Sequence, residues 1–178
     1  RVGSPKMAGY VELGGSFGGA YLLRRGLFMP WELSKVLDQD MVTEGLSILS
    51  PVEKLNESCS SIKEPLRKIA LLETIFYMRN QLLRDADWAG MAQSVEIRLP
   101  LVDSFLFEAL APILLRRGGA SKLGLSMMPS RALPKAIIER KKTGFFIPLE
   151  GWLSKRHGSC DRGLRGWAKM VYASSIKV

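Results

Sequence analysis

The segment SIKEPLRKIALLETIFYMRNQLLRDAD, residues 61–87, carries the strongest secondary-structure signal in the chain. Ser61 is a suitable helix cap, and Pro65 is well tolerated in a first helical turn. Apolar residues recur at helical spacing and leave only a narrow polar stripe: Leu66, Ile69, Leu72, Ile75, Phe76, Leu82 and Leu83. Because a helix that is apolar on most faces needs other elements to cover it, the segment is predicted to be central and the least exposed helix.

The flanking sequence predicts further helices. Residues 104–117, SFLFEALAPILLRR, form one candidate, with Asp103 as its cap and a basic last turn before a Gly-Gly stop. Shorter helices are expected in residues 20–28 and 29–37, after Pro134, after Pro148 and in residues 164–175. No strand-like alternation of convincing length is present. The sequence therefore predicts a mainly α fold, with residues 1–178 forming a single helical domain.

The first residues, RVGSPKMAGYVELGGSFGGAY, are rich in glycine and small side chains. This composition favours a loop with close backbone approach over a packed element. The GGSFGG run matches neither of the common glycine-rich phosphate-binding motifs, and no strand pattern precedes it. Residues 1–21 are therefore predicted to be a surface or interdomain loop.

Composition limits the classes of function. The chain has 178 residues, 47% of them hydrophobic, which suits one domain with an ordinary core. Its net charge of +9 suits an anionic partner, such as nucleic acid, a phosphate-rich small molecule or an acidic protein surface. The two cysteines, Cys59 and Cys160, form neither a CxxC pair nor a disulfide framework, which favours a reducing, cytoplasmic compartment. No apolar run approaches the roughly 20 residues that span a membrane, and no signal peptide is recognisable.

Two stretches place charges among apolar residues, which stability alone rarely selects. Ionised groups are costly to bury unless each meets a partner, so such charges indicate internal ion pairs or a polar ligand. In NQLLRDADWAGMAQSVEIRLPLVD, residues 80–103, a plain interpretation is a buried Glu96–Arg98 brace that joins two helices. In LPKAIIERKKTGFFIPLEGWL, residues 133–153, the basic triplet 140–142 can simply complement the end of a helix.

Both stretches resemble one protein family. LLRDADWAGMAQSVEIRLPLVD, residues 82–103, is similar to the form LLxDxDRxSMAHSxExRxPFLD of asparagine synthetases and related glutamine-dependent amidotransferases. Residues 133–153 resemble that family's LPxxIxxRxKxGFxxPxxxWL, and the two blocks come in the family's order. YLLRRGLFMPWEL, residues 21–33, looks like the start of the same C-terminal region. The resemblance extends from about Gly14 to Trp152 and implies the helical C-terminal portion of an adenine-nucleotide α-hydrolase-like (ATP-pyrophosphatase) synthetase domain.

The resemblance also implies a chemistry. Such synthetase domains bind ATP with Mg²⁺ and aspartate or a related carboxylate, form aspartyl-adenylate, and let ammonia attack the activated carboxylate. Lys142 matches the lysine of the RxKxGF block, which implies that it contacts the phosphates and acts as the catalytic cation. Arg140 is the second cation of that block and is expected to support nucleotide binding. Four further matched residues are expected to shape the pocket: Asp87, Glu96, Arg98 and Asp103. No metal ligand is expected among the residues of this chain.

The chain departs from the family form at two positions. Trp88 stands where the family usually has a basic residue, and Gln93 stands where it often has histidine. Because tryptophan carries no charge, either another basic residue replaces that cation or the substrate or activity has changed.

Two parts of the family's enzymes are not found in the sequence. They are the N-terminal glutaminase domain with its nucleophilic cysteine and the SGGxDS pyrophosphate loop, which cradles the ATP phosphates. We therefore expect a C-terminal piece or truncated relative of a synthetase that needs these parts as partners and is inactive alone.

Two alternatives come from other classes of function. A basic helical nucleic-acid-binding module is suggested by the net charge, by basic pairs such as Arg24 and Arg25, and by Trp152 and Trp167, which could stack on bases. However, the basic pairs are scattered at predicted helix ends, and no nucleic-acid-binding motif is present. The other alternative is a lobe that only mediates assembly. Salt-dependent oligonucleotide binding would favour the first alternative, and saturable ATP·Mg²⁺ binding would favour a synthetase.

Overall fold

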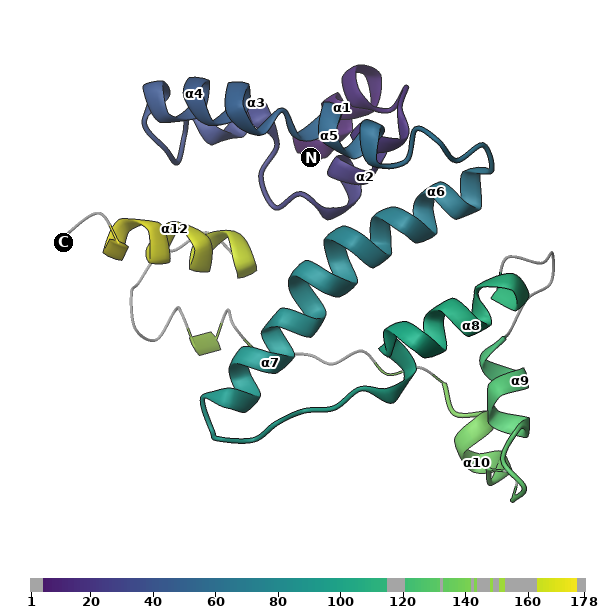
Figure 1. Cartoon of the computed structure of the whole chain (residues 1–178). Helices are drawn as coiled ribbons and strands as arrows, with labels where there is room; N and C mark the ends of the chain where they lie inside the picture. The colour runs from purple at the N-terminus through teal and green to yellow at the C-terminus, as the bar shows by residue number, and fades with distance from the viewer. Residues whose placement is uncertain are drawn as a thin grey trace. The chain divides into compact units, whose positions relative to one another are not determined.

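The computed structural model describes residues 5–114, 121–131, 133–141, 143, 148, 151–152 and 163–175. Within these ranges every regular element is a helix, which confirms the mainly α prediction (Figure 1). The elements are α1 (Pro5–Leu13), α2 (Phe17–Arg25), α3 (Pro30–Leu33), α4 (Gln39–Leu49), α5 (Pro51–Ser58), α6 (Pro65–Leu72), η1 (Glu73–Leu83), α7 (Arg84–Met91), η2 (Pro100–Val102), α8 (Ser104–Leu114), α9 (Lys122–Met127), α10 (Lys135–Ile138) and α12 (Gly163–Ser175). None of the helices described is long and apolar enough to cross a membrane.

The chain divides into two compact units. The first comprises Arg1–Asn80 and Ile147–Val178, and the second comprises Gln81–Phe146. Such a division can occur within one domain or between two, so the single-domain expectation stays a prediction.

The glycine-rich start of the chain forms two helices, so the prediction of a loop over residues 1–21 was wrong for its described part. Its glycines instead allow helices to pack closely. Gly18, in α2, lies so near α5 that a Cβ atom would be 2.7 Å from the Val52 carbonyl oxygen. The Gly18 N–H also donates a hydrogen bond of 2.8 Å to Asn56 Oδ1. Close backbone approach was therefore predicted correctly, but helices rather than a loop make it.

The core of the first unit lies where α2, α5 and α6 meet. Its central buried residues are Tyr21, Leu55, Cys59 and Leu72, and four half-buried residues pack around them: Phe17, Leu22, Leu71 and Phe76. Gly18 allows α2 to approach α5, and the apolar side chains fill the remaining space. The core is small because only one face of α6 takes part in it.

The long helix predicted from residues 61–87 is present, but its predicted burial was wrong. Residues 65–91 are helical throughout, first as α6, then as the π-helix η1, then as α7. Leu72 is only 1% exposed, whereas Leu66 is 72% exposed and Leu82 is 47% exposed. The apolar pattern correctly indicated a helix, but α2 and α5 cover one side of its first half and leave the remaining faces open.

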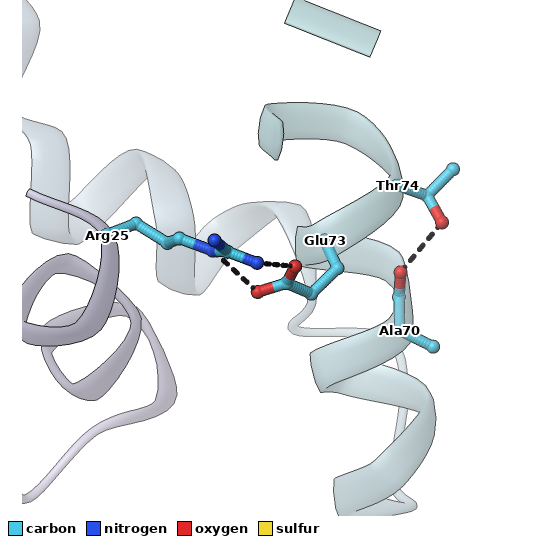
Figure 2. Close-up of polar contacts among 4 residues, drawn as sticks. All are labelled: Arg25, Ala70, Glu73 and Thr74. Atoms are coloured by element: carbon cyan, nitrogen blue, oxygen red, sulfur yellow. Dashed lines mark hydrogen bonds and ion pairs between the residues drawn. The ribbon is translucent and has the colours of Figure 1, made fainter. Parts of the chain in front are cut away.

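An ion pair fastens α2 to the start of η1 (Figure 2). The Arg25 guanidinium donates two hydrogen bonds to the Glu73 carboxylate, one of them 3.0 Å from Nε to Oε1. The same guanidinium stacks over the Tyr77 ring at 3.5 Å from its centroid. The hydrogen bonds from Arg25 hold the pKa of Glu73 below its ordinary range, although partial burial opposes this shift. Nearby, Thr74 Oγ1 donates to the Ala70 carbonyl within the helix.

A second ion pair in this unit connects α3 with α12. Glu32 is buried, and its carboxylate accepts hydrogen bonds from the Met29 N–H at 2.9 Å and from the Arg165 guanidinium. Burial by itself would raise the pKa of Glu32, but these two donors outweigh it and lower the pKa. Arg165 also lies over the Phe28 ring at 4.6 Å. The buried charge is therefore paired, as the cost of burial requires.

In the second unit, the described residues include no buried large apolar side chain. The helix α8 shows this most clearly, since it is apolar around most of its circumference. Phe105 is 80% exposed, and Phe107 and Ile113 are about half exposed, at 48% and 51%. The described part of this unit is therefore held mainly by helical hydrogen bonds, caps and turns.

Candidate functional site

The matched segment 82–103 begins at the end of η1, continues through α7 and turns where that helix ends. The Gly90 carbonyl accepts hydrogen bonds of 2.9 Å from the N–H groups of both Gln93 and Val95. Ser94 takes the left-handed conformation, with φ of 56°. A Cβ atom on Gly90 would lie 2.6 Å from the Val95 carbonyl oxygen, so this turn needs a glycine there. The turn sets the direction of the backbone segment that contains Glu96 and Arg98.

Glu96 and Arg98 form the ion pair that their spacing predicted. Arg98 Nε lies 3.0 Å from Glu96 Oε1, and Arg98 Nη2 lies 3.4 Å from Oε2. The prediction that this pair is a buried brace between two helices was wrong. The two side chains are 66% and 81% exposed, and both come from the non-helical segment after α7. Since exposed pairs contribute only about 0–1 kcal/mol, this pair adds little to the stability of the fold.

Asp103 caps α8, as predicted. Its Oδ1 atom accepts a hydrogen bond of 3.0 Å from the Leu106 N–H, which satisfies one of the free donors at the helix start. This contact gives Asp103 a structural role that does not depend on any ligand.

The remaining predicted site residues are spread over two segments. Asp87 is exposed in α7, and Arg140 is exposed just after α10. Lys142 lies outside the described residues. Within the described part of the chain, no contact joins the Glu96–Arg98 pair to Asp87, Asp103 or Arg140. The assembly of these residues into one pocket stays a prediction.

Across the described ranges, no group of three His, Cys, Asp or Glu side chains is arranged to hold a metal ion. These residues therefore do not form a cage for Mg²⁺ by themselves.

A further contact in α7 was not predicted from the sequence. The Arg84 guanidinium lies over the Trp88 ring, 4.8 Å from its centroid. The two residues are four apart, a spacing that brings side chains together on a helix, so the pattern could have revealed the contact. Trp88 is the position at which the family form has a basic residue.

Comparison with known proteins places these segments in context. The asparagine synthase family model matches residues 6–165, a range that contains both segments 82–103 and 133–153. Asparagine synthetase (glutamine-hydrolyzing) 1 of Bacillus subtilis is 31% identical over 108 residues, which are 59% of this chain and 17% of that protein. Proteins of Mycobacterium tuberculosis and Mycobacterium bovis, provisionally named asparagine synthetase (glutamine-hydrolyzing), are 27% identical over 118 residues, 63% of this chain and 17% of each relative.

The chain thus spans about a sixth of the length of the curated relatives that it matches. No solved structure matches it at a significant level. The family match covers most of the chain and includes the turn at Gly90, the Glu96–Arg98 pair and the basic triplet 140–142. On this basis the chain belongs to the asparagine synthase family.

Proposed function

We propose that the chain is the C-terminal portion of an ATP-dependent asparagine synthase-like amidotransferase. In the first step, a carboxylate oxygen of aspartate, or of a related acid, attacks the α-phosphorus of ATP. The bond to pyrophosphate breaks, and pyrophosphate leaves. In the second step, ammonia released from glutamine attacks the acyl carbon, AMP leaves with the bonding electrons, and a proton is lost from nitrogen. The products are the amide, AMP and pyrophosphate.

One observation carries the proposal: the family match extends over residues 6–165 and includes both blocks in the family's order. The chain also has a net charge of +9, which suits a phosphate-rich ligand. The proposed reaction further requires a glutaminase domain and a pyrophosphate-loop segment as partners. The reaction and the cysteine usage both favour a cytoplasmic enzyme.

Lys142 is proposed as the catalytic cation. Negative charge accumulates on the phosphate oxygens as the bond to pyrophosphate breaks, and a fixed ammonium group stabilises that charge. Arg140 is exposed near the end of α10, where its cation can attract the nucleotide without needing to reach the reacting atoms. Mg²⁺ would enter with ATP and neutralise phosphate charge.

The other matched residues are proposed to position the pocket. After the Gly90 turn, the exposed Glu96–Arg98 pair places a carboxylate and a guanidinium side by side, joined by two hydrogen bonds. Asp103 fixes the start of α8, which follows this segment. Asp87 contributes an exposed carboxylate from α7.

Substitution of Lys142 in the complete enzyme tests the proposal. We expect Lys142→Ala to slow pyrophosphate release by about a hundredfold to a thousandfold, the usual loss when a group that stabilises transition-state charge is removed. Lys141→Ala is the matched control, because this neighbour carries the same charge and has no counterpart in the family block. Glutamine hydrolysis and thermal stability should be nearly unchanged in both variants. If both variants release pyrophosphate within about threefold of the parent rate, Lys142 acts only as a helix-end charge.

A further inference from the structure

The Arg84–Trp88 pair lies on the exposed surface of α7. Both residues are exposed, and Trp88 is 64% exposed. The Arg84 guanidinium is 4.8 Å from the centroid of the Trp88 ring. Among the residues that the structure describes, Arg84 makes no ion pair or hydrogen bond, even though two carboxylates, Asp85 and Asp87, lie in the same turn of helix.

The Trp88 ring holds the Arg84 guanidinium with its central carbon 4.8 Å from the ring centroid, and the N–H groups of Arg84 donate to no acceptor among the described residues. A guanidinium on an aromatic ring interacts through its planar face, whereas its five N–H groups lie at the edge of that plane. The edge of an arginine is suited to two parallel hydrogen bonds with a phosphate group. The ring also restricts the long side chain in advance, so less conformational entropy is lost when an anion binds.

The carboxylates beside Arg84 indicate which kind of anion could bind there. Asp85 and Asp87 are the carboxylates nearest in sequence to Arg84, and their negative charges oppose the approach of a free anion. An anion whose charge is partly neutralised meets less repulsion. A magnesium-bound diphosphate or triphosphate has this property, and it is the kind of anion that the proposed reaction uses and releases.

We propose that Arg84, held in place by Trp88, is a phosphate-binding cation that replaces the basic residue of the family form at position 88. This inference rests on the proposed function. It accounts for the absence of a basic residue at position 88, where this chain has Trp88. The charge missing from position 88 is supplied from one helical turn earlier, and the stack puts it over the side chain at that position. Trp88 is a positioning residue, and Arg84 contacts the ligand.

The inference is tested by binding of magnesium pyrophosphate to the purified 178-residue chain. The indole N–H resonances of the tryptophans report binding even when it is weak, and Trp88→Phe identifies the Trp88 resonance. Titrations at constant ionic strength remove non-specific screening effects. Arg79→Ala is the matched control, because Arg79 is an exposed arginine of the same helical run whose Nε donates to Asn80 rather than stacking on a ring.

The expected losses of affinity are graded. Arg84→Ala should weaken binding by about tenfold, as expected for loss of a charge-assisted hydrogen bond at an exposed site. Trp88→Leu should weaken it by about two- to fivefold, the range of an exposed cation–π contact. Trp88→Phe retains an aromatic face and should cause a smaller loss than Trp88→Leu. Arg84→Lys retains the charge but loses the planar edge, so its affinity should lie between those of Arg84→Ala and the wild type.

The possible results distinguish failure of the Arg84 inference from failure of the proposed function. Equal affinities of Arg84→Ala and Arg79→Ala overturn the inference. If Lys142→Ala then abolishes the binding that Arg84→Ala retains, the proposed function survives without it. Loss in Arg84→Ala together with full binding in Lys142→Ala supports the inference and removes Lys142 as the main phosphate contact. A wild-type chain that does not bind magnesium pyrophosphate overturns the inference alone, because the proposed function, which requires the pyrophosphate-loop segment as a partner, is tested separately by Lys142→Ala in the complete enzyme. Because Arg84 and Trp88 are exposed, the variants should remain folded, and far-UV circular dichroism checks this.

Discussion

Replacement of Gly18 by alanine tests the packing of the first unit. The added Cβ would lie 2.7 Å from the Val52 carbonyl oxygen, 2.8 Å from Asn56 Oδ1 and 2.9 Å from Asn56 Cγ. The Asn56 side chain can move, but it would then lose its hydrogen bond from the Gly18 N–H. The Val52 oxygen is part of the α5 backbone, so relief of that contact requires α5 to shift away from α2.

Gly45→Ala provides the matched control. Gly45 lies inside α4, and a Cβ atom there would have no neighbour within 4 Å. Alanine is favoured over glycine in a helix interior by about 0.8–1.0 kcal/mol, and Gly18, in the first turn of α2, gains at most this amount. The difference between the two variants therefore reports mainly the cost of overpacking, which is typically about 1–3 kcal/mol.

Urea denaturation followed by circular dichroism at 222 nm measures both variants. We expect Gly45→Ala to be slightly more stable than the wild type and Gly18→Ala to be less stable than Gly45→Ala by about 2 kcal/mol. For a protein of this size that difference shifts the denaturation midpoint by about 1 M urea. Equal midpoints for the two variants would show that α2 and α5 do not approach as closely as described.

Two glutamates test the difference between a partly buried ion pair and an exposed one. Glu73→Gln should destabilise the first unit by about 1 kcal/mol at neutral pH, because the bidentate Arg25 contact is lost. Since the folded-state pKa of Glu73 is lowered, this contribution is present above the ordinary carboxyl pKa and disappears as the pH falls through the lowered value. The stability difference from the wild type, measured by urea denaturation at several pH values, should therefore vanish in acid; a constant difference would contradict the assigned role. Glu96→Gln should change stability by less than about 0.5 kcal/mol, since both Glu96 and its partner Arg98 are exposed; a larger loss in the same measurement would support a buried Glu96–Arg98 brace instead.

The sequence predicted the class of fold because helical periodicity is a local property. It identified the helix from Pro65 onward and the cap at Asp103, since both depend on residues within a few positions of one another. It failed at Gly18, because glycine density is typical of loops and of closely packed helices alike. Only the position of Val52, 34 residues away, distinguishes the two cases.

Burial was less predictable than helicity. Leu66 and Leu72 have the same apolar character, yet one is 72% exposed and the other 1% exposed. The difference arises because the residues of α2 and α5 cover one side of α6, which the local pattern does not reveal.

In the candidate site, too, contacts between near neighbours in sequence were predictable and exposure was not. The spacing of Glu96 and Arg98 correctly predicted a pair, since the partners are only two residues apart. Their exposure depends on the turn at Gly90 and on Ser94, whose left-handed conformation no pattern indicated. Lys142 was identified by resemblance to a family and stays a prediction. The Arg84–Trp88 contact joins residues four apart on one helix, so their spacing alone indicates it.

The exposed apolar surface of α8 has a thermodynamic consequence. The heat capacity of unfolding comes mainly from apolar surface that water reaches only after the chain unfolds. In the folded state the Phe105 side chain is already mostly hydrated, and those of Phe107 and Ile113 are about half hydrated, so melting of α8 adds less to this quantity than melting of a buried helix would. The buried side chains of the first unit, which include the cluster around Tyr21, Leu55, Cys59 and Leu72, therefore contribute most of the curvature of the unfolding free energy against temperature. Below the temperature at which that cluster melts, α8 should lose its structure gradually, with the broad enthalpy change of an isolated helix.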